Sequence, residues 1–213
     1  ELVIPDLSRL QIKEEAFTGS AFVYKDEKYT LKMAGRHQIY NATAAIEAAR
    51  QAARKGFALT GARIRQGIAS AQMPARLEVL SERPLILLDG AHNAGGAQAL
   101  ADTLSRCLRG EKLTVVIGML RDKNYEAMLT QLAPYAKAFI AVEPDSPRAL
   151  PAAALADRAS RRHPDASAAP DYDAALKTAA EKSNGGPVLI CGSLYLASAI
   201  RQKALDFAKS LQK

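Results

Sequence analysis

The stretch LILLDGAHNAGGAQAL, Leu85–Leu100, places an acid, a histidine and an amide where a buried strand is expected to become a helix. Four aliphatic residues lead directly into Asp89, and His92 and Asn93 follow before an alanine-rich helical pattern. The free N–H groups and the dipole of a helix start favour negatively charged groups. This turn is therefore a candidate site for an anionic ligand.

Polar and charged residues also follow the other apolar runs of this part of the chain. Arg121–Lys123 comes after VVIGML, Glu143–Arg148 comes after FIAV, and Ser193 comes shortly after VLIC. Ligands of open α/β sheets bind outside the carboxyl ends of the strands. Because these turns would share one edge of a sheet, we expect them to form a ligand-binding rim.

Each of these residues also has a purely structural interpretation. Asp89 and Ser193 are residue types that cap helices. His92 could lie on a surface turn, and Asp122 with Lys123 could form a solvated pair in a turn. Both interpretations stay open for each residue taken singly, and the clustering at one predicted edge is what favours a ligand site.

Short apolar runs alternate with amphipathic helical patterns from Arg76 onward. This alternation is typical of a parallel sheet with helices on both faces. We predict an α/β, Rossmann-like domain with a mostly parallel sheet that opens with a strand pair. The stretch HPDASAAPDYD, 163–173, is expected to be an exposed linker. The expected strands cover 76–80, 84–90, 113–120, 138–144 and 187–193, and the expected helices cover 99–110, 124–134, 151–162, 172–182 and 194–211.

Residues 1–73 follow another pattern. Ala21–Gly35 predicts a β-hairpin around the polar turn KDEK. Alanine and isoleucine at helical spacing predict a helix over 37–56, and Thr60 is placed to cap a second helix that ends before Pro74. We therefore predict a boundary between a small α+β portion, 1–73, and the α/β domain, 74–213.

The composition narrows the class of protein. The 213 residues are 48% hydrophobic and 24% charged, with a net charge of +7. No apolar run is long enough to cross a bilayer, and no secretory signal is visible. The basic residues are scattered and there is no tryptophan, whereas nucleic-acid binders gather charge on one stripe. We expect a cytoplasmic protein that binds neither nucleic acid nor membrane, with a basic cleft for phosphates and carboxylates.

The chain lacks the motifs that would bind a triphosphate by themselves. It has neither G-x-x-x-x-G-K-[ST] nor a G-x-G-x-x-G after a strand, and no G-x-S-x-G elbow. No Cys/His cluster has the spacing of a metal site, and the two cysteines are expected to be free thiols. The residues alone thus indicate an α/β ligand-binding domain without its own phosphate loop.

Six motifs occur in a fixed order and together resemble the second half of the folylpolyglutamate synthase/dihydrofolate synthase family, ATP-dependent amide-bond-forming ligases typified by the Mur enzymes. The resemblance covers about residues 30 to 200. It implies that 1–73 is the C-terminal part of a central ATPase domain, and that 74–213 is a Mur ligase C-terminal domain. It also implies that the phosphate loop and the metal ligands lie upstream, in a longer enzyme. The motifs are GRHQIYNATAAIEAA, MPARLEV, ILLDGAHNAGGAQAL, GMLRDKNY, PDSPRAL and ICGSLYL.

The resemblance also implies roles for single residues. In that family ATP binds between the two domains, so Asn41 would contact the adenine, Arg76 a phosphate and Asp89 the ribose hydroxyls. The chemistry suits each partner, because an amide both donates and accepts and a guanidinium fork matches phosphate. His92 and Ser193 are candidates for contact with the incoming glutamate. No catalytic residue is assigned, and no metal ligand is expected within this chain.

The function implied is ATP-dependent ligation of L-glutamate to folate or dihydropteroate through an acyl phosphate, with ATP and Mg²⁺ as cofactors. We expect a monomer, and we expect the isolated chain to be inactive because it lacks a phosphate loop. The alternatives are another Mur-type amino-acid ligase, a non-enzymatic nucleotide- or polyanion-binding domain, and nucleic-acid binding through the positive charge. Which of the two synthase activities is present, and the number of glutamates added, stay open.

Overall fold

The computed structural model describes residues 2–211 and divides into two compact units, Glu1–Met73 and Pro74–Lys213. We refer to them as the N-terminal unit and the C-terminal unit. Among the described residues, no helix combines the length and the apolar character that a membrane span requires.

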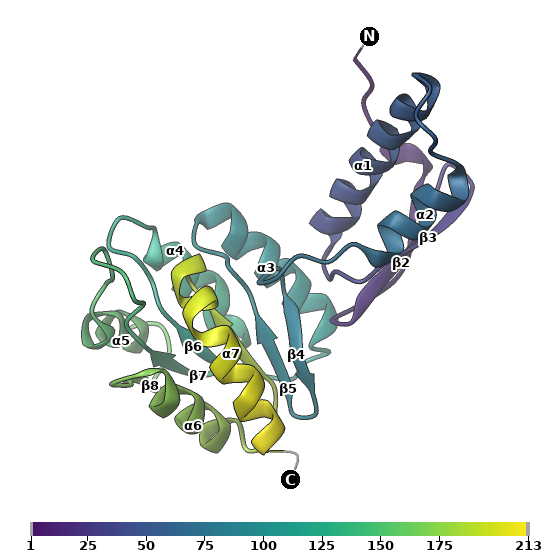
Figure 1. Cartoon of the computed structure of the whole chain (residues 1–213). Coiled ribbons are helices and arrows are strands. Elements are labelled where there is room, and N and C mark those ends of the chain that lie inside the picture. The colour runs from purple at the N-terminus through teal and green to yellow at the C-terminus, as the bar shows by residue number, and fades with distance from the viewer. Residues whose placement is uncertain (1, 212–213) are drawn as a thin grey trace. The chain divides into compact units, whose positions relative to one another are not determined.

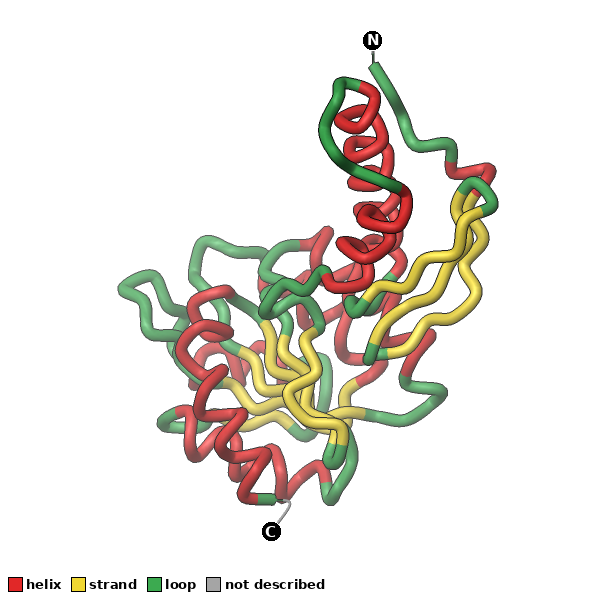
Figure 2. Tube along the Cα trace, turned by 45° about the vertical axis from the view of Figure 1, so that its right-hand side comes forward, coloured by secondary structure: helices red, strands yellow, loops and turns green. Residues whose placement is uncertain are grey.

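A three-stranded antiparallel sheet, order β1-β2-β3, forms one layer of the N-terminal unit, and its strands run side by side in Figure 2. The predicted hairpin is confirmed as β2 (Gly19–Tyr24) and β3 (Glu27–Leu31), joined by two residues with positive φ. The first strand, β1 (Leu10–Ala16), was not predicted. All of its side chains are half-buried or exposed. A strand that buries no side chain completely needs no strict apolar alternation, and the sequence LQIKEEA shows none that is clear.

Two helices, α1 (Arg36–Arg54) and α2 (Gly61–Ser70), form the other layer and confirm the two predicted helices. The predicted cap of α2 is also confirmed, since the Thr60 hydroxyl accepts a hydrogen bond from the N–H of Arg63 at 3.3 Å. Aromatic rings of the sheet pack against isoleucines that recur at helical spacing. A short 3₁₀ turn, η1 (Leu7–Arg9), precedes β1. The buried core consists of Phe22, Tyr24, Tyr29, Leu31, Ile39, Ala42, Ile46, Ile64 and Ile68.

The C-terminal unit is built on a six-stranded sheet of order β4-β5-β9-β6-β7-β8. Every neighbouring pair is parallel except β4–β5, which is antiparallel. The predicted mostly parallel sheet with an initial strand pair is therefore confirmed. The strands are β4 (Glu78–Glu82), β5 (Leu85–Leu88), β6 (Leu113–Ile117), β7 (Ala136–Ala141), β8 (Ala166–Ala168) and β9 (Val188–Cys191).

Helices cover both faces of this sheet, as predicted. Alternate strand residues such as Leu88, Val116 and Ile190 share a core with α6 and α7, which lie in front of the sheet in Figure 1. Side chains point alternately to opposite faces of a strand, so Leu87, Val115 and Leu189 face the far side, where Figure 1 shows α3 and α4. The helices are α3 (Ala94–Cys107), α4 (Tyr125–Leu132) with the 3₁₀ turn η2 (Ala133–Tyr135), α5 (Ala152–Ser160), α6 (Tyr172–Ser183) and α7 (Leu194–Ser210).

The two edges of the sheet are irregular or short. The outer strand β4 pairs with β5 through a register shift between Val79 and Ser81. The other edge is β8, only three residues long and paired with β7. The expectation of a linker throughout 163–173 is therefore wrong, because β8 lies inside it. Three small residues, ASA, are too few to produce a periodic pattern in the sequence.

Glycines let the ends of neighbouring strands approach backbone to backbone. Gly192, after β9, has φ of 114°, and a Cβ there would lie 2.6 Å from the carbonyl oxygen of Gly118, after β6. A Cβ on Gly118 would in turn lie 2.8 Å from the carbonyl oxygen of Val142, after β7. Only glycine fits both positions without moving the backbone, so the carboxyl ends of three strands are held close together.

Replacing Gly192 by alanine should therefore destabilise the C-terminal unit strongly. We expect a loss of about 3 kcal/mol in the free energy of unfolding, from the positive φ and from the clash with backbone. Gly185→Ala is the matched control, because Gly185 has φ of 81° with open space around it, and should cost only about 1 kcal/mol. Urea denaturation measures both, and equal losses would contradict the close packing described.

Candidate functional site

The predicted rim exists at the carboxyl ends of β5, β9, β6 and β7, which are neighbours in that order. Main-chain hydrogen bonds continue beyond the strands and tie the rim segments together. Asp89 N–H donates to the carbonyl of Ile190 at 2.9 Å, and Gly192 N–H donates to the carbonyl of Ala91 at 3.1 Å. The residues expected from the apolar runs thus come from segments that contact each other.

Asp89 binds main-chain N–H groups on two sides. One carboxylate oxygen accepts from the N–H of Leu77 at 2.7 Å, and the other accepts from the N–H of Ala91, also at 2.7 Å. The N–H of Gly90 donates to the carbonyl of Ala75 at 2.8 Å. These bonds fasten the segment Ala75–Leu77 to the end of β5.

Arg76 lies in the middle of that fastened segment and is half-buried. Its two neighbours, Ala75 and Leu77, have positive φ of 55° and 49°. A guanidinium nitrogen of Arg76 lies 3.3 Å from the position that a Cβ on Gly90 would occupy, so its side chain lies against the turn that carries Asp89. The structure therefore brings Arg76 and Asp89 together, as their 13-residue separation allowed.

The carboxyl of Asp89 has an unusual proton affinity. Burial raises its pKa to about 6, while hydrogen bonds from Ala91 and Leu77 and the charges of Arg76 and His92 act in the opposite direction. Burial is the largest of these effects because an ionised carboxylate loses its hydration. Burial also raises the pKa of the free thiol of Cys191, and the charge of Asp89 adds to that rise. A titratable group with a shifted pKa at a strand end is typical of a functional site.

His92 lies on the same turn. Its Nδ1 is 2.9 Å from the carbonyl oxygen of Gly90. Because a carbonyl only accepts, Nδ1 carries a hydrogen in this contact, and in the neutral ring Nε2 is left as an acceptor. The next residue, Asn93, caps α3 by accepting a hydrogen bond from the N–H of Gly96 at 2.8 Å. Contact of His92 with glutamate stays a prediction.

Ser193 is buried, with 1% of its surface exposed. Its hydroxyl oxygen accepts a hydrogen bond from the N–H of Leu196 at 3.0 Å and caps α7. The structural interpretation that the sequence left open therefore holds for this side chain. A contact between Ser193 and glutamate stays a prediction, which would require the hydroxyl to serve two partners.

Asn41 belongs to the N-terminal unit, where it lies exposed on α1. Its side-chain N–H donates to the side-chain oxygen of Gln38 at 3.2 Å, one helical turn earlier. Gln38 is buried and so restricts the orientation of the Asn41 amide. The carboxamide oxygen of Asn41 can still accept, and its contact with an adenine stays a prediction.

A contact that sequence reasoning missed joins three loops of the rim. Asp122, after β6, forms ion pairs with Lys123 at 3.2 Å and with Arg148, after β7, at 3.3 Å. The guanidinium of Arg148 lies over the ring of Tyr195, at the start of α7, 6.0 Å from its centroid. The hydrogen bond from Lys123 and the two positive charges lower the pKa of Asp122. The polar residues expected after the strands include Asp122, Lys123 and Arg148, and Tyr195 follows Ser193 by two positions, but nothing in their spacing indicates which of them touch.

Within residues 2–211, no group of three or more His, Cys, Asp or Glu side chains could hold a metal ion. Mg²⁺ is commonly held by one or two carboxylates together with water and substrate phosphates, so such a cluster is not required for Mg²⁺, and no chemical step is assigned to a metal.

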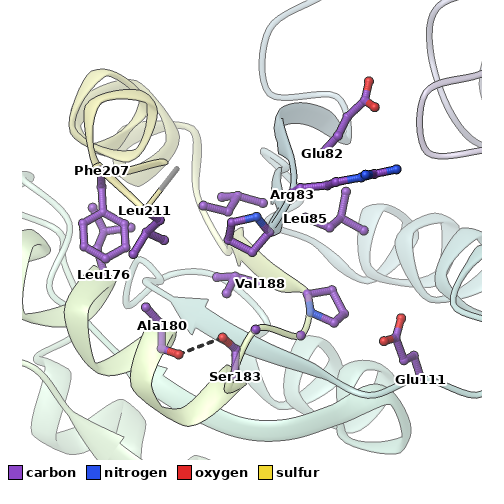
Figure 3. A pocket seen from close by; sticks show the side chains of 15 residues that line it. Glu82, Arg83, Leu85, Glu111, Leu176, Ala180, Ser183, Val188, Phe207 and Leu211 are labelled. Carbon is purple, nitrogen blue, oxygen red and sulfur yellow. Dashed lines mark hydrogen bonds between the residues drawn. The ribbon is translucent and has the colours of Figure 1, made fainter. Parts of the chain in front are cut away.

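A cavity of about 600 Å³ lies at the opposite end of the sheet (Figure 3). It is lined by the starts of β5 and β9 together with α6 and α7. Figure 3 shows Phe207, Leu176 and Leu211 on one side and Glu82 and Arg83 on the other. Because ligands of such sheets bind at the carboxyl ends of the strands, the volume of this cavity does not make it the candidate site.

The fold and the rim define a class of protein, and comparison with known families agrees. Residues 75–194 match the family described as Mur ligase, glutamate ligase domain. The match covers more than half of the chain, so the chain belongs to this family. The resemblance predicted from the six motifs is thereby confirmed.

Several proteins similar to this chain are folylpolyglutamate or dihydrofolate synthases. The chain is 37% identical over 194 residues to the folylpolyglutamate synthase of Lacticaseibacillus casei, covering 88% of this chain and 44% of that protein. It is 34% identical over 197 residues to the dihydrofolate synthase/folylpolyglutamate synthase of Bacillus subtilis, covering 89% and 46%. The structure resembles Mycobacterium tuberculosis folylpolyglutamate synthase complexed with ADP and AMPPCP, with a TM-score of 0.79, 30% identity, and coverage of 92% and 48%. The chain thus spans about half the length of these relatives and matches their C-terminal part.

Asp89→Asn tests the raised pKa of the Asp89 carboxyl. Because its native pKa of about 6 exceeds the ordinary 3.8, the native state binds more protons than the unfolded state between these values. The stability from this effect is complete below about pH 4 and is lost as the pH rises through 6. The free energy of unfolding of the wild type, relative to Asp89→Asn, should fall by up to about 3 kcal/mol between pH 4 and pH 7. Urea denaturation across this range measures the difference, and a constant or growing difference would contradict the raised pKa.

Proposed function

We propose that the enzyme containing this chain is an ATP-dependent ligase that joins L-glutamate to folate or dihydropteroate, a folylpolyglutamate or dihydrofolate synthase. One observation carries the proposal. Hydrogen bonds hold the segment that contains Arg76 beside Asp89, at the strand ends of a domain that matches the glutamate ligase family. The identity to the Lacticaseibacillus casei synthase along most of the chain supports the choice of folate substrates.

The proposed reaction passes through an acyl phosphate. A carboxylate oxygen of the pteroyl substrate attacks the γ-phosphorus of ATP, and the bond to ADP breaks. The amine of glutamate then attacks the acyl carbon, the bond to phosphate breaks, and the amine loses a proton. Water must be excluded while the acyl phosphate exists.

In this scheme the residues of the chain bind and orient the nucleotide. Arg76 would donate N–H groups to a phosphate, which the guanidinium fork matches. Asp89 would accept from the ribose hydroxyls with the lone pairs that Leu77 and Ala91 do not use, since each carboxylate oxygen can accept more than once. Asn41 would contact the adenine, and His92 and Ser193 would contact glutamate.

The phosphate loop and the Mg²⁺ ligands would come from parts of the enzyme outside this chain. Residues 1–73 would be the C-terminal part of the central ATPase domain, and residues 74–213 the C-terminal domain. We further propose that the enzyme is a monomer, works in the cytoplasm, and binds neither nucleic acid nor membrane.

The reaction itself is tested with the full-length enzyme. ATP-dependent addition of glutamate to folate or dihydropteroate is expected, and no addition to a muramyl substrate. The isolated 213 residues should show no turnover. Turnover with the muramyl substrate alone would assign another Mur-type ligase. Nucleotide binding without turnover of either substrate by the full-length enzyme would favour a non-enzymatic binding domain, and turnover by the isolated chain would contradict its predicted inactivity.

The nucleotide contacts are tested by Arg76→Ala and Asp89→Ala in the full-length enzyme. Each should raise the KM for ATP at least about tenfold, since a charge-assisted hydrogen bond contributes about 1.5–3 kcal/mol. Arg83→Ala is the control, because Arg83 is exposed beside the cavity at the opposite end of the sheet, and should leave the KM for ATP unchanged. Unchanged KM values in both variants of the rim would remove the assignment.

A further inference from the structure

An ion pair in the C-terminal unit joins the first strand of its sheet to its last helix. Glu78 begins β4, and Arg201 lies in the middle of α7, 123 residues later. The Nε of Arg201 donates to both carboxylate oxygens of Glu78 at 3.1 Å, and its Nη2 donates to Oε1 at 2.6 Å. A carboxylate that accepts from two nitrogens of one guanidinium is fixed in position and in orientation. The nucleotide assignment does not use this pair.

The carboxylate of Glu78 also binds the main chain beside Arg76. Its Oε2 accepts a hydrogen bond from the N–H of Ala75 at 3.0 Å. Ala75 is buried and has φ of 55°. A buried N–H needs a partner, and the left-handed conformation is unfavourable for alanine. The bond from Glu78 therefore helps to hold a conformation that alanine does not adopt by preference.

Arg76 thus lies between two residues whose N–H groups are each held by a carboxylate. Glu78 holds Ala75 on one side, and Asp89 holds Leu77 on the other at 2.7 Å. The direction in which a side chain leaves the backbone is set by the peptide groups on both sides of its Cα. The direction of the Arg76 side chain therefore depends on both carboxylates.

The charge of Glu78 depends on its partners. Only 20% of its side chain is exposed. Burial acts to raise the pKa of Glu78, but the hydrogen bonds from Arg201 and from the N–H of Ala75, together with the charge of Arg201, lower that pKa below its ordinary value. An unpaired carboxylate in this place would lose hydration without compensation. Removal of Arg201 should therefore disturb the carboxylate that binds Ala75.

Arg201 is anchored by the helix that carries it. Its neighbour Ile200 is fully buried in the core that α7 shares with the sheet. At about 1.5 Å per residue, Arg201 lies roughly 10 Å along the helix from Leu194, whose side chain lies against the turn at Gly90. Its guanidinium is used by Glu78. Arg201 is therefore suited to act through Glu78 rather than by contact with the nucleotide.

We propose that Glu78, held in place by Arg201, is a positioning residue that directs Arg76 toward a phosphate of the nucleotide. This inference rests on the proposed ligase function and on the proposed contact of Arg76 with ATP. Contacts run without a break from α7 through Glu78 to Ala75, the residue before Arg76. A pair with a structural role alone would stabilise the C-terminal unit without a specific effect on the binding of ATP.

The test is steady-state kinetics of the full-length enzyme with Glu78→Ala and Arg201→Gln, varying ATP, glutamate and folate in turn. The KM for ATP should rise about fivefold in Glu78→Ala and about threefold in Arg201→Gln, with kcat and the other two KM values within about twofold. Arg201→Lys should recover part of the loss, because it keeps the charge without the fork. If Glu78→Ala does not fold, the two Arg201 variants decide the question.

A double variant shows whether Glu78 acts through Arg76. Once Arg76 is replaced by alanine, adding Glu78→Ala should change the KM for ATP by less than about twofold, because the residue to be positioned is gone. An equal rise with and without Arg76 would overturn the inference, since Glu78 would then act independently of it.

Lys203→Gln is the matched control, since Lys203 lies on the same helix and pairs with Asp173 of α6 at 2.7 Å. It should leave all constants within about twofold. An unchanged KM for ATP in the Glu78 and Arg201 variants, with Arg76→Ala impaired, would overturn the inference and leave the nucleotide assignment standing. A fall in kcat without a rise in that KM would show a structural role alone and would also overturn it. An inactive wild type would overturn the proposed function and this inference with it.

Discussion

The candidate site depends on one carboxylate that accepts a main-chain hydrogen bond on each side. Asp89 joins the turn after β5 to the segment Ala75–Leu77, which directly follows the start of the C-terminal unit. The segment is also held by the bond from the N–H of Gly90 to the carbonyl of Ala75, and by the N–H of Ala75, which donates to the carboxylate of Glu78 at 3.0 Å. The position of Arg76 therefore depends in part on Asp89, although the two lie 13 residues apart. One side chain thus builds the site and also belongs to it.

The sheet supplies the second constraint. Parallel strands end at the same edge, so the loops after β5, β9, β6 and β7 form one rim whatever their sequences. Close backbone contact at Gly118 and Gly192 keeps these ends from separating. The side chain of Leu194, at the start of α7, and the guanidinium of Arg76 both lie against Gly90, so the turn after β5 and the start of α7 are parts of one continuous rim.

Much of the fold could be predicted because buried strands are apolar throughout and helices show a 3.6-residue period. Strands β6, with VVI, and β9, VLIC, can be recognised in the sequence for this reason. Strands β1 and β8 carry too little apolar pattern to be recognised. Candidate site residues could be located because strand ends are recognisable in a sequence. Their contacts could not be predicted. Whether Ser193 caps a helix or faces a ligand, and whether Arg148 pairs with Asp122, is decided by loop conformations that depend on packing over long sequence distances.

The irregular edges of the sheet have a consequence for self-association. An edge strand exposes unpaired N–H and C=O groups to which a second chain can add. Here one edge is a strand of three residues, and the other has a register shift and an acidic residue at each end, Glu78 and Glu82. Glu78 is moreover paired with Arg201 of α7 at 2.6 Å, which ties that edge to its own helix layer. Both edges therefore resist continuation of the sheet into a neighbouring molecule, a form of protection against edge-to-edge aggregation that is built into the fold itself.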